Sequence, residues 1–258
     1  MSLTKLAIRF AVKTPKPEEF DNYLFIGPHP DDIEIGAGAS VAKLAATGKH
    51  IDFLICTDGR YGDGYSNGFT GDDLAALRKE EALKSAAMLG VSREHVHFLN
   101  LGDGMGYTES ELLCAMAAEI GRIKPDIIFA PDPMSKSESH KDHLNIGNAA
   151  KALACFAPYE SLMKERFGAQ SAPVKAIAYY MTARPNRFIR TKGFTKLQND
   201  SIFKCHLSQY PEGSPDVSSL RLYLKLRSIQ YGLRTFSTHA EGFRVYGSTH
   251  MHCLPEAD

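Results

Sequence analysis

The feature of the sequence that most limits its fold is a regular alternation of short apolar runs with helical segments. Five runs have the length of a β-strand, at residues 23–27, 51–56, 95–99, 126–130 and 174–181. Helical segments lie between them, at residues 37–48, 72–89, 109–123 and 140–157. Strands that alternate with helices form parallel sheets. We therefore expect an α/β, Rossmann-like fold, with a mostly parallel sheet and helices on both faces.

The pattern changes after about residue 190. Two helical stretches and one strand-like segment follow, at residues 197–208, 216–235 and 243–246. A further edge strand is expected at residues 5–12. The chain has 258 residues, of which 43% are hydrophobic, and this suits one sizeable core. We expect a single domain over residues 1–258, with its core at about 22–190 and a helical C-terminal extension at about 191–258.

Charge and cysteine content limit the partners and the location. Lys and Arg total 30, as do Asp and Glu, so no net positive field attracts nucleic acid. The five cysteines are scattered without a CxxC pair, which is typical of reduced thiols in the cytoplasm. Residues 1–14 lack the long apolar stretch of a signal peptide, and no run is long enough to span a membrane. We expect a cytoplasmic protein without nucleic-acid partners. Whether it forms a homo-oligomer is left open by the sequence.

Two polar clusters follow the first and the fourth predicted strand. Their members are His29, Asp31, Asp32, His140, Asp142 and His143. The carboxyl ends of parallel strands meet at one edge of a sheet, so both clusters are expected there. A catalytic zinc ion takes three protein ligands, usually histidines with a carboxylate, and keeps one position for water. The sequence therefore predicts a zinc site formed by His29, Asp32 and His143.

The other members of the clusters suit the remaining chemistry of a hydrolase. Asp31, next to a metal ligand, can act as general base. His140 can stabilise an oxyanion or relay a proton. Asp142 is expected to support the ligands rather than to bind the ion. The same ligands would also suit iron(II) or cobalt, because a set of two histidines and one carboxylate is shared among these metals.

The motif at residues 26–38, Ile-Gly-Pro-His-Pro-Asp-Asp-Ile-Glu-Ile-Gly-Ala-Gly, resembles the opening motif of the PIG-L / LmbE-like de-N-acetylase family. That family includes the N-acetylglucosaminyl-phosphatidylinositol deacetylases and the deacetylases of the mycothiol and bacillithiol pathways. His-Lys-Asp-His at residues 140–143 resembles the second metal motif of the family and is also specific. Individually weaker matches lie at residues 57–59, 78–81, 101–104, 204–209 and 240–243. The resemblance covers about residues 22–246.

The resemblance implies a zinc-dependent hydrolase that removes an N-acetyl group from an amino sugar or glycoconjugate and releases acetate. It implies the same metal ligands as the spacing does, with Asp31 as base and His140 beside the oxyanion. It further implies that Arg78 contacts sugar hydroxyls or a phosphate and that Asp103 lines the sugar pocket. The implied partner is thus a small N-acetylated sugar or conjugate.

Two departures from the family pattern leave the substrate open. Arg60 stands where the family often has Glu, and Arg190 stands where it often has Asp. A metal-dependent amidohydrolase that acts on another N-acyl metabolite is one alternative. A non-catalytic module that binds metal or sugar is another, although such a module has no need of the base Asp31.

Overall fold

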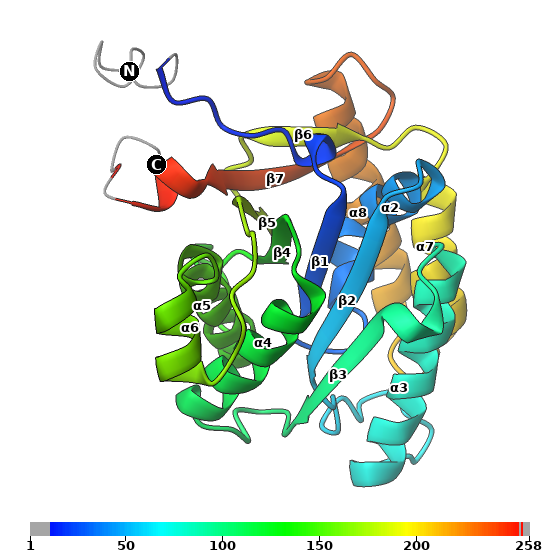
Figure 1. The fold of residues 1–258 in the computed structure, drawn as a ribbon. Helices are drawn as coiled ribbons and strands as arrows, with labels where there is room; N and C mark the ends of the chain where they lie inside the picture. Colours follow the sequence, from blue (N-terminus) through cyan, green and yellow to red (C-terminus); the bar gives the residue numbers. More distant parts are fainter. Residues whose placement is uncertain (1–10, 253, 255–258) are drawn as a thin grey trace.

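The computed structural model describes residues 11–252 and residue 254. It contains one seven-stranded sheet with the strand order β3-β2-β1-β4-β5-β7-β6 (Figure 1). The strands are β1 Asn22–Gly27, β2 His50–Thr57, β3 Val96–Leu101, β4 Ile127–Pro131, β5 Ala176–Tyr180, β6 Arg187–Arg190 and β7 Ala240–Gly247. Strands β1 to β5 pair in parallel, whereas β7 is antiparallel to both β5 and β6. The predicted α/β fold with a mostly parallel sheet is confirmed.

Helices cover both faces of the sheet, as predicted (Figure 1). The α-helices are α2 Asp32–Ala46, α3 Gly71–Met88, α4 Glu109–Ile123, α5 Lys141–Phe156, α6 Glu160–Phe167, α7 Thr195–Cys205 and α8 Pro215–Leu233. Three short 3-10 helices are η1 Pro17–Glu19, η2 Arg93–His95 and η3 Ser248–Met251. One core cluster joins the sheet to α2 and α3, and a second joins it to α4, α5 and α6. No helix among the described residues is long and apolar enough to cross a membrane.

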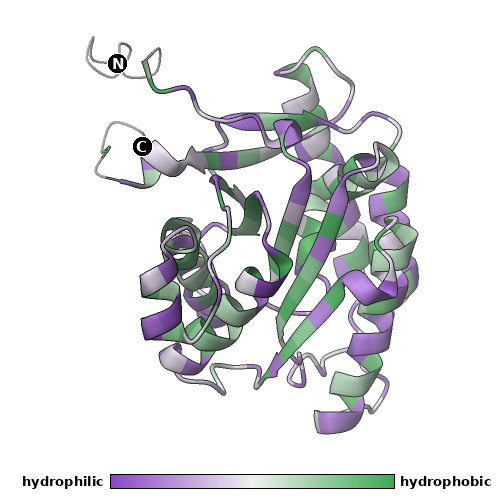
Figure 2. Cartoon of the chain, viewed as in Figure 1, coloured by the Kyte–Doolittle hydropathy of each residue, from purple (hydrophilic) through white to green (hydrophobic). Residues whose placement is uncertain are grey.

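The central strands are apolar on both faces because each face is covered by helices. In β1, Tyr23 and Phe25 belong to the core under α2 and α3, whereas Leu24 and Ile26 belong to the opposite core. The sheet is accordingly rich in hydrophobic residues between more polar helix surfaces (Figure 2). Burial on both faces explains why these strands have continuous apolar runs in the sequence.

Three features differ from the sequence-based expectation or lie outside it. The strand-like segment expected at residues 243–246 is part of β7, but this strand enters the sheet between β5 and β6, so the C-terminal extension is not only helical. Strand β6 and helix α6 were not predicted, since β6 has only four residues with an arginine at each end and α6 follows α5 after a short break. Most of the strand expected at residues 5–12 lies outside the described residues, and its last two residues are not in a strand.

Candidate metal centre

The loop between β1 and α2 brings His29 and Asp32 together at the carboxyl edge of the sheet. The Pro28 carbonyl accepts hydrogen bonds from the backbone N–H and the hydroxyl of Thr57, at 2.9 and 2.7 Å, which fixes the loop against β2. Oδ2 of Asp32 accepts the backbone N–H of His29 at 2.9 Å and lies 3.1 Å from Nδ1 of the same histidine. Asp31 between them has φ 140°, a strained value for a residue with a side chain.

The start of α5 supplies the third predicted ligand. Nε2 of His143 lies 3.3 Å from Oδ2 of Asp32. One ligand atom each from His29, Asp32 and His143 lies within 4.8 Å of the other two. Zinc bonds of 2.0–2.2 Å at tetrahedral angles would place ligand atoms about 3.3–3.6 Å apart. The three side chains therefore have a spacing that fits one zinc ion, while their role as ligands stays a prediction.

Carboxylates hold the other ring nitrogen of both histidines. Nε2 of His29 lies 3.1 Å from Oδ1 of Asp103, and Nδ1 of His143 lies 3.0 Å from Oε2 of Glu138. Histidines that bind metals usually donate their second N–H to a carboxylate or carbonyl, which fixes the tautomer and the ring orientation. This arrangement leaves Nδ1 of His29 and Nε2 of His143 available, and these are the two nitrogens nearest to Asp32.

The electrostatics of the site favour a cation. Burial alone would lower the pKa of His29, but hydrogen bonds with Asp103, Asp142 and Asp32 raise it well above its usual value. Likewise, burial would raise the pKa of Asp32, but the charges and hydrogen bonds of His143 and His29 lower it strongly. Several buried carboxylates thus stabilise positive charge at this point, and a metal ion would supply it. The donor set and its charge fit zinc.

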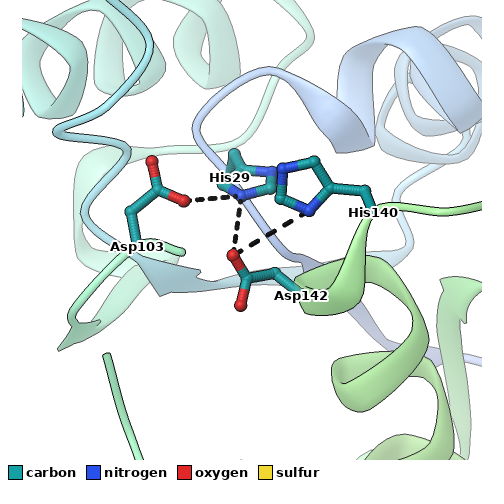
Figure 3. Close-up of side chains that lie close together, drawn as sticks. All are labelled: His29, Asp103, His140 and Asp142. Atoms are coloured by element: carbon teal, nitrogen blue, oxygen red, sulfur yellow. Dashed lines mark hydrogen bonds and ion pairs between the residues drawn. The ribbon is translucent and has the colours of Figure 1, made fainter. Parts of the chain in front are cut away.

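Asp142 fastens the turn after β3 to the start of α5. Its fully buried carboxylate accepts the backbone N–H groups of Gly104 and Met105, at 2.9 and 3.0 Å, and the Tyr107 hydroxyl at 2.6 Å. Its Oδ2 also lies 3.5 Å from Nε2 of His29 (Figure 3). These contacts agree with the expected supporting role of Asp142.

His140 lies beside the three predicted ligands and is accessible from outside. Its ring centroid is 4.7 Å from that of His29 and 5.0 Å from that of His143. Its side chain is half exposed, and its Nδ1 lies 3.9 Å from Oδ2 of Asp142 (Figure 3). A histidine in this position can reach a bound substrate, so its predicted role beside the oxyanion is sterically feasible.

Arg78 and Asp31 form a buried ion pair. Nη2 of Arg78 lies 3.3 Å from Oδ2 of Asp31 and donates to the Pro30 carbonyl at 3.0 Å, while Nη1 donates to the Gly59 carbonyl at 2.9 Å. Burial raises the pKa of Asp31 to about 6, although the charge of Arg78 opposes this shift. The Arg78 side chain is only 5% exposed. These contacts favour a role in orienting Asp31, and the predicted contact with substrate stays untested.

Asp103 lies at the site, as the sequence suggested, where it contacts a predicted metal ligand and a backbone N–H group. It contacts His29 through Oδ1 (Figure 3). Its Oδ2 accepts the backbone N–H of Tyr61 at 3.2 Å. Its place in a sugar pocket stays a prediction. Sequence reasoning missed Glu138 and Tyr107. The one available signal for Glu138 was an acidic residue two positions before His140, in the loop that precedes α5.

Comparisons with known proteins show to which family the chain belongs. The sequence model of PIG-L, GlcNAc-PI de-N-acetylase, matches residues 24–154. Diacetylchitobiose deacetylase of Thermococcus kodakarensis is 32% identical over 240 residues, which cover 91% of this chain and 86% of the relative. The solved structure of N,N'-diacetylchitobiose deacetylase from Pyrococcus horikoshii, in complex with its inhibitor MPG, has a TM-score of 0.86 and 26% identity. That match covers 99% of this chain and 97% of the other.

A further relative is 1D-myo-inositol 2-acetamido-2-deoxy-α-D-glucopyranoside deacetylase of Kineococcus radiotolerans, 26% identical over 197 residues, or 65% of this chain and 53% of the relative. The sheet with its edge site, together with these relatives, defines the class as that of the metal-dependent N-deacetylases, hydrolases of linear amides. Within this class, the chain belongs to the PIG-L family of de-N-acetylases.

Proposed function

We propose that this enzyme uses zinc to remove the N-acetyl group of an amino sugar, and that its first substrate to test is an N-acetylated chitobiose. The observation that carries the proposal is the cluster of His29, Asp32 and His143 with the buried carboxylate of Asp31 beside it. The relative that is 32% identical is a diacetylchitobiose deacetylase, and this supports the choice of sugar.

In the proposed reaction, His29, Asp32 and His143 hold the ion. When bound, zinc supplies Lewis-acid polarisation of the acetamide carbonyl and makes water acidic enough to ionise at about pH 7. Asp31 takes the proton of the attacking water and later delivers it to the nitrogen of the departing amine. Arg78 holds the Asp31 carboxylate in place through its ion pair. The products are acetate and the free amino sugar.

His140 is proposed to stabilise the negative charge that develops on the carbonyl oxygen. Its half-exposed ring lies next to the rings of His29 and His143, at the open side of the cluster. A donor that is already positioned there stabilises the tetrahedral oxyanion more than the planar amide, which lowers the barrier. This role differs from metal binding, so loss of His140 should lower the rate and leave the metal content unchanged.

The entrance to the site offers an aromatic surface for a sugar ring. Tyr61 is 69% exposed, and its ring lies next to Gly104 in the turn that contains Asp103. Exposed aromatic rings provide flat apolar area for stacking. We propose that Tyr61 packs against the sugar unit beside the reacting one. Arg60, one of the departures from the family pattern, is paired with Asp58 and Asp72, so its charge is balanced within the protein.

We propose a single domain that acts in the cytoplasm on small N-acetylated sugars, without nucleic-acid partners. Limited proteolysis tests the single domain, and light scattering of the purified protein tests for a homo-oligomer.

The decisive experiment measures metal content and product together. Protein purified without added metal is analysed for its elements and then incubated with diacetylchitobiose, N-acetylglucosamine and a panel of other N-acyl metabolites. We expect zinc, and release of acetate that stops with a chelator and returns with zinc. Release of a different acid would favour the broader amidohydrolase, and bound zinc without any turnover would favour a binding module.

A further inference from the structure

A second group of histidines surrounds a buried carboxylate near the amino ends of the strands, opposite to the end that carries the candidate metal centre. Asp52 lies near the start of β2, and its side chain is only 4% exposed. Three histidine side chains approach its two oxygens, with Nε2 of His50 at 3.0 Å, Nδ1 of His95 at 3.1 Å and Nε2 of His97 at 2.7 Å. His50 also belongs to β2, while His95 and His97 come from η2 and β3.

The pairing of β2 with β3 creates this cluster. The two strands are parallel, with Leu54 opposite His97. Asp52, two residues before Leu54, therefore lies beside the start of β3. Asp52 is five residues before Thr57, which ends the strand at the catalytic edge. With about 3.3 Å per residue, this distance is about 17 Å. The cluster is therefore separate from the catalytic centre.

One oxygen of Asp52 lacks the hydrogen bond that its burial would demand. Oδ1 is hydrogen-bonded to His95 and His97. Oδ2 is buried and has no hydrogen-bond partner, although Nε2 of His50 lies 3.0 Å away. The contact with His50 is therefore an ion pair by distance but not a hydrogen bond by geometry. Buried polar atoms are nearly always satisfied, and an exception calls for an explanation such as an ion.

We propose that this cluster binds a second divalent transition-metal ion, through His50, Asp52 and His95. One ligand atom from each of these residues lies within 4.8 Å of the other two. The ring centroids of His50 and His95 are 4.5 Å apart, so the two imidazoles lie side by side next to Asp52. Two imidazoles and one carboxylate suit zinc and its neighbours in the first transition row.

The charge and the surroundings of the cluster agree with a metal site. Burial alone would raise the pKa of Asp52, but hydrogen bonds with His97 and His95 lower it. His97 is the least exposed of the three histidines, and its contact holds Oδ1 in place while Oδ2 faces His50. Metal-binding carboxylates are commonly held in this way by a second contact.

The consequence of binding would be structural. Within the described residues, β3 is an edge strand of the sheet and β2 is its only neighbour (Figure 1). An ion held by His95 before β3 and by two residues of β2 would join these strands. Because an ion that binds only the folded state raises stability, the melting temperature should rise with the concentration of free metal.

The test counts metal ions in variants that separate the two sites. The parent chain, saturated with zinc and freed of weakly bound metal, should hold about two ions per molecule. A His50→Ala/His95→Ala variant should hold about one and keep its deacetylase activity. A His143→Ala variant should lose activity yet still bind zinc, and added zinc should raise its melting temperature. His239→Ala, which removes a histidine bonded to Ser228, is the control and should bind as the parent does.

Two results would overturn the proposal. One is an equal zinc content in the parent and in the His50→Ala/His95→Ala variant. The other is a His143→Ala variant whose melting temperature does not respond to zinc, because histidine–carboxylate contacts alone would then account for the cluster. His50 and His95 are 48% and 34% exposed, so neither substitution disturbs the core. Since metal is counted directly, the result does not depend on the proposed substrate.

Discussion

Replacement of Arg78 by Met separates two roles for this arginine. The sequence predicts that Arg78 contacts the substrate, whereas the structure pairs it with Asp31 and with the carbonyls of Pro30 and Gly59. If Arg78 acts on the base, its loss must change the titration of Asp31. If it contacts the sugar, its loss must weaken substrate binding and leave that titration unchanged.

The size of the effect follows from the ion pair. An arginine next to an aspartate lowers the pKa of the carboxyl group by about one to three units. Burial raises the pKa of Asp31 to about 6 even with Arg78 present. Without that charge, the pKa of Asp31 must rise further. A general base works only when ionised, so activity is lost as pH falls through its pKa. We expect the acid limb of kcat/KM to move up by about one to three pH units in Arg78→Met.

The same substitution also removes the arginine partner of Asp31 in a buried site. Removal of one partner from a buried ion pair typically lowers the free energy of unfolding by about 3–5 kcal/mol. Urea denaturation of Arg78→Met measures this loss. It also identifies the conditions under which the variant stays folded, and its activity is measured there. Arg78→Lys does not keep the set of three contacts, but it keeps the positive charge. Because the charge sets the pKa of Asp31, the acid limb of this variant should stay near that of the parent.

The assay is acetate release by metal-saturated enzyme, with kcat and KM determined across the pH range. Lys79→Met is a matched control, because Lys79 is the next residue on α3, is exposed, and places its ammonium 4.8 Å from the centre of the Phe98 ring. Its acid limb should not move. An Arg78→Met variant with a raised KM and an unchanged acid limb would refute the role in orienting Asp31 and support contact with substrate.

Three further predictions follow from the site and from the helix behind it. Asp31→Asn should lower kcat by about 10²–10⁴-fold and keep the metal, whereas Asp32→Asn should lose the metal. Elemental analysis distinguishes the two variants, and normal turnover by Asp31→Asn would exclude Asp31 as the base. Glu138→Gln should weaken zinc binding by about 10–100-fold in chelator competition, and an unchanged affinity would contradict its orienting role. Gly36→Ala should lower the free energy of unfolding by about 1–3 kcal/mol in urea, because the added Cβ would lie 2.2 Å from Cδ2 of Tyr180; unchanged stability would mean that α2 can shift.

Much of the predicted site followed from where polar residues stand relative to strands. His29 and Asp32 come directly after β1, and His143 comes soon after β4, which is paired with β1. Parallel strands end at a common edge, so the sequence alone predicts that these residues, far apart in the chain, lie together. The same reasoning could not find Glu138, because its proposed role depends on a single contact with His143. That contact depends on the path of the loop before α5.

The sequence by itself determined the α/β class, the order of the first five strands along the chain and the grouping of the polar clusters. These features depend on periodicity and on turn residues, which are local. Only the tertiary structure decided that β7 enters the sheet, that Arg78 is enclosed by backbone carbonyls, and that three histidines meet Asp52. Each of these depends on which distant surfaces are buried against one another, and burial is decided by the packing of the whole chain.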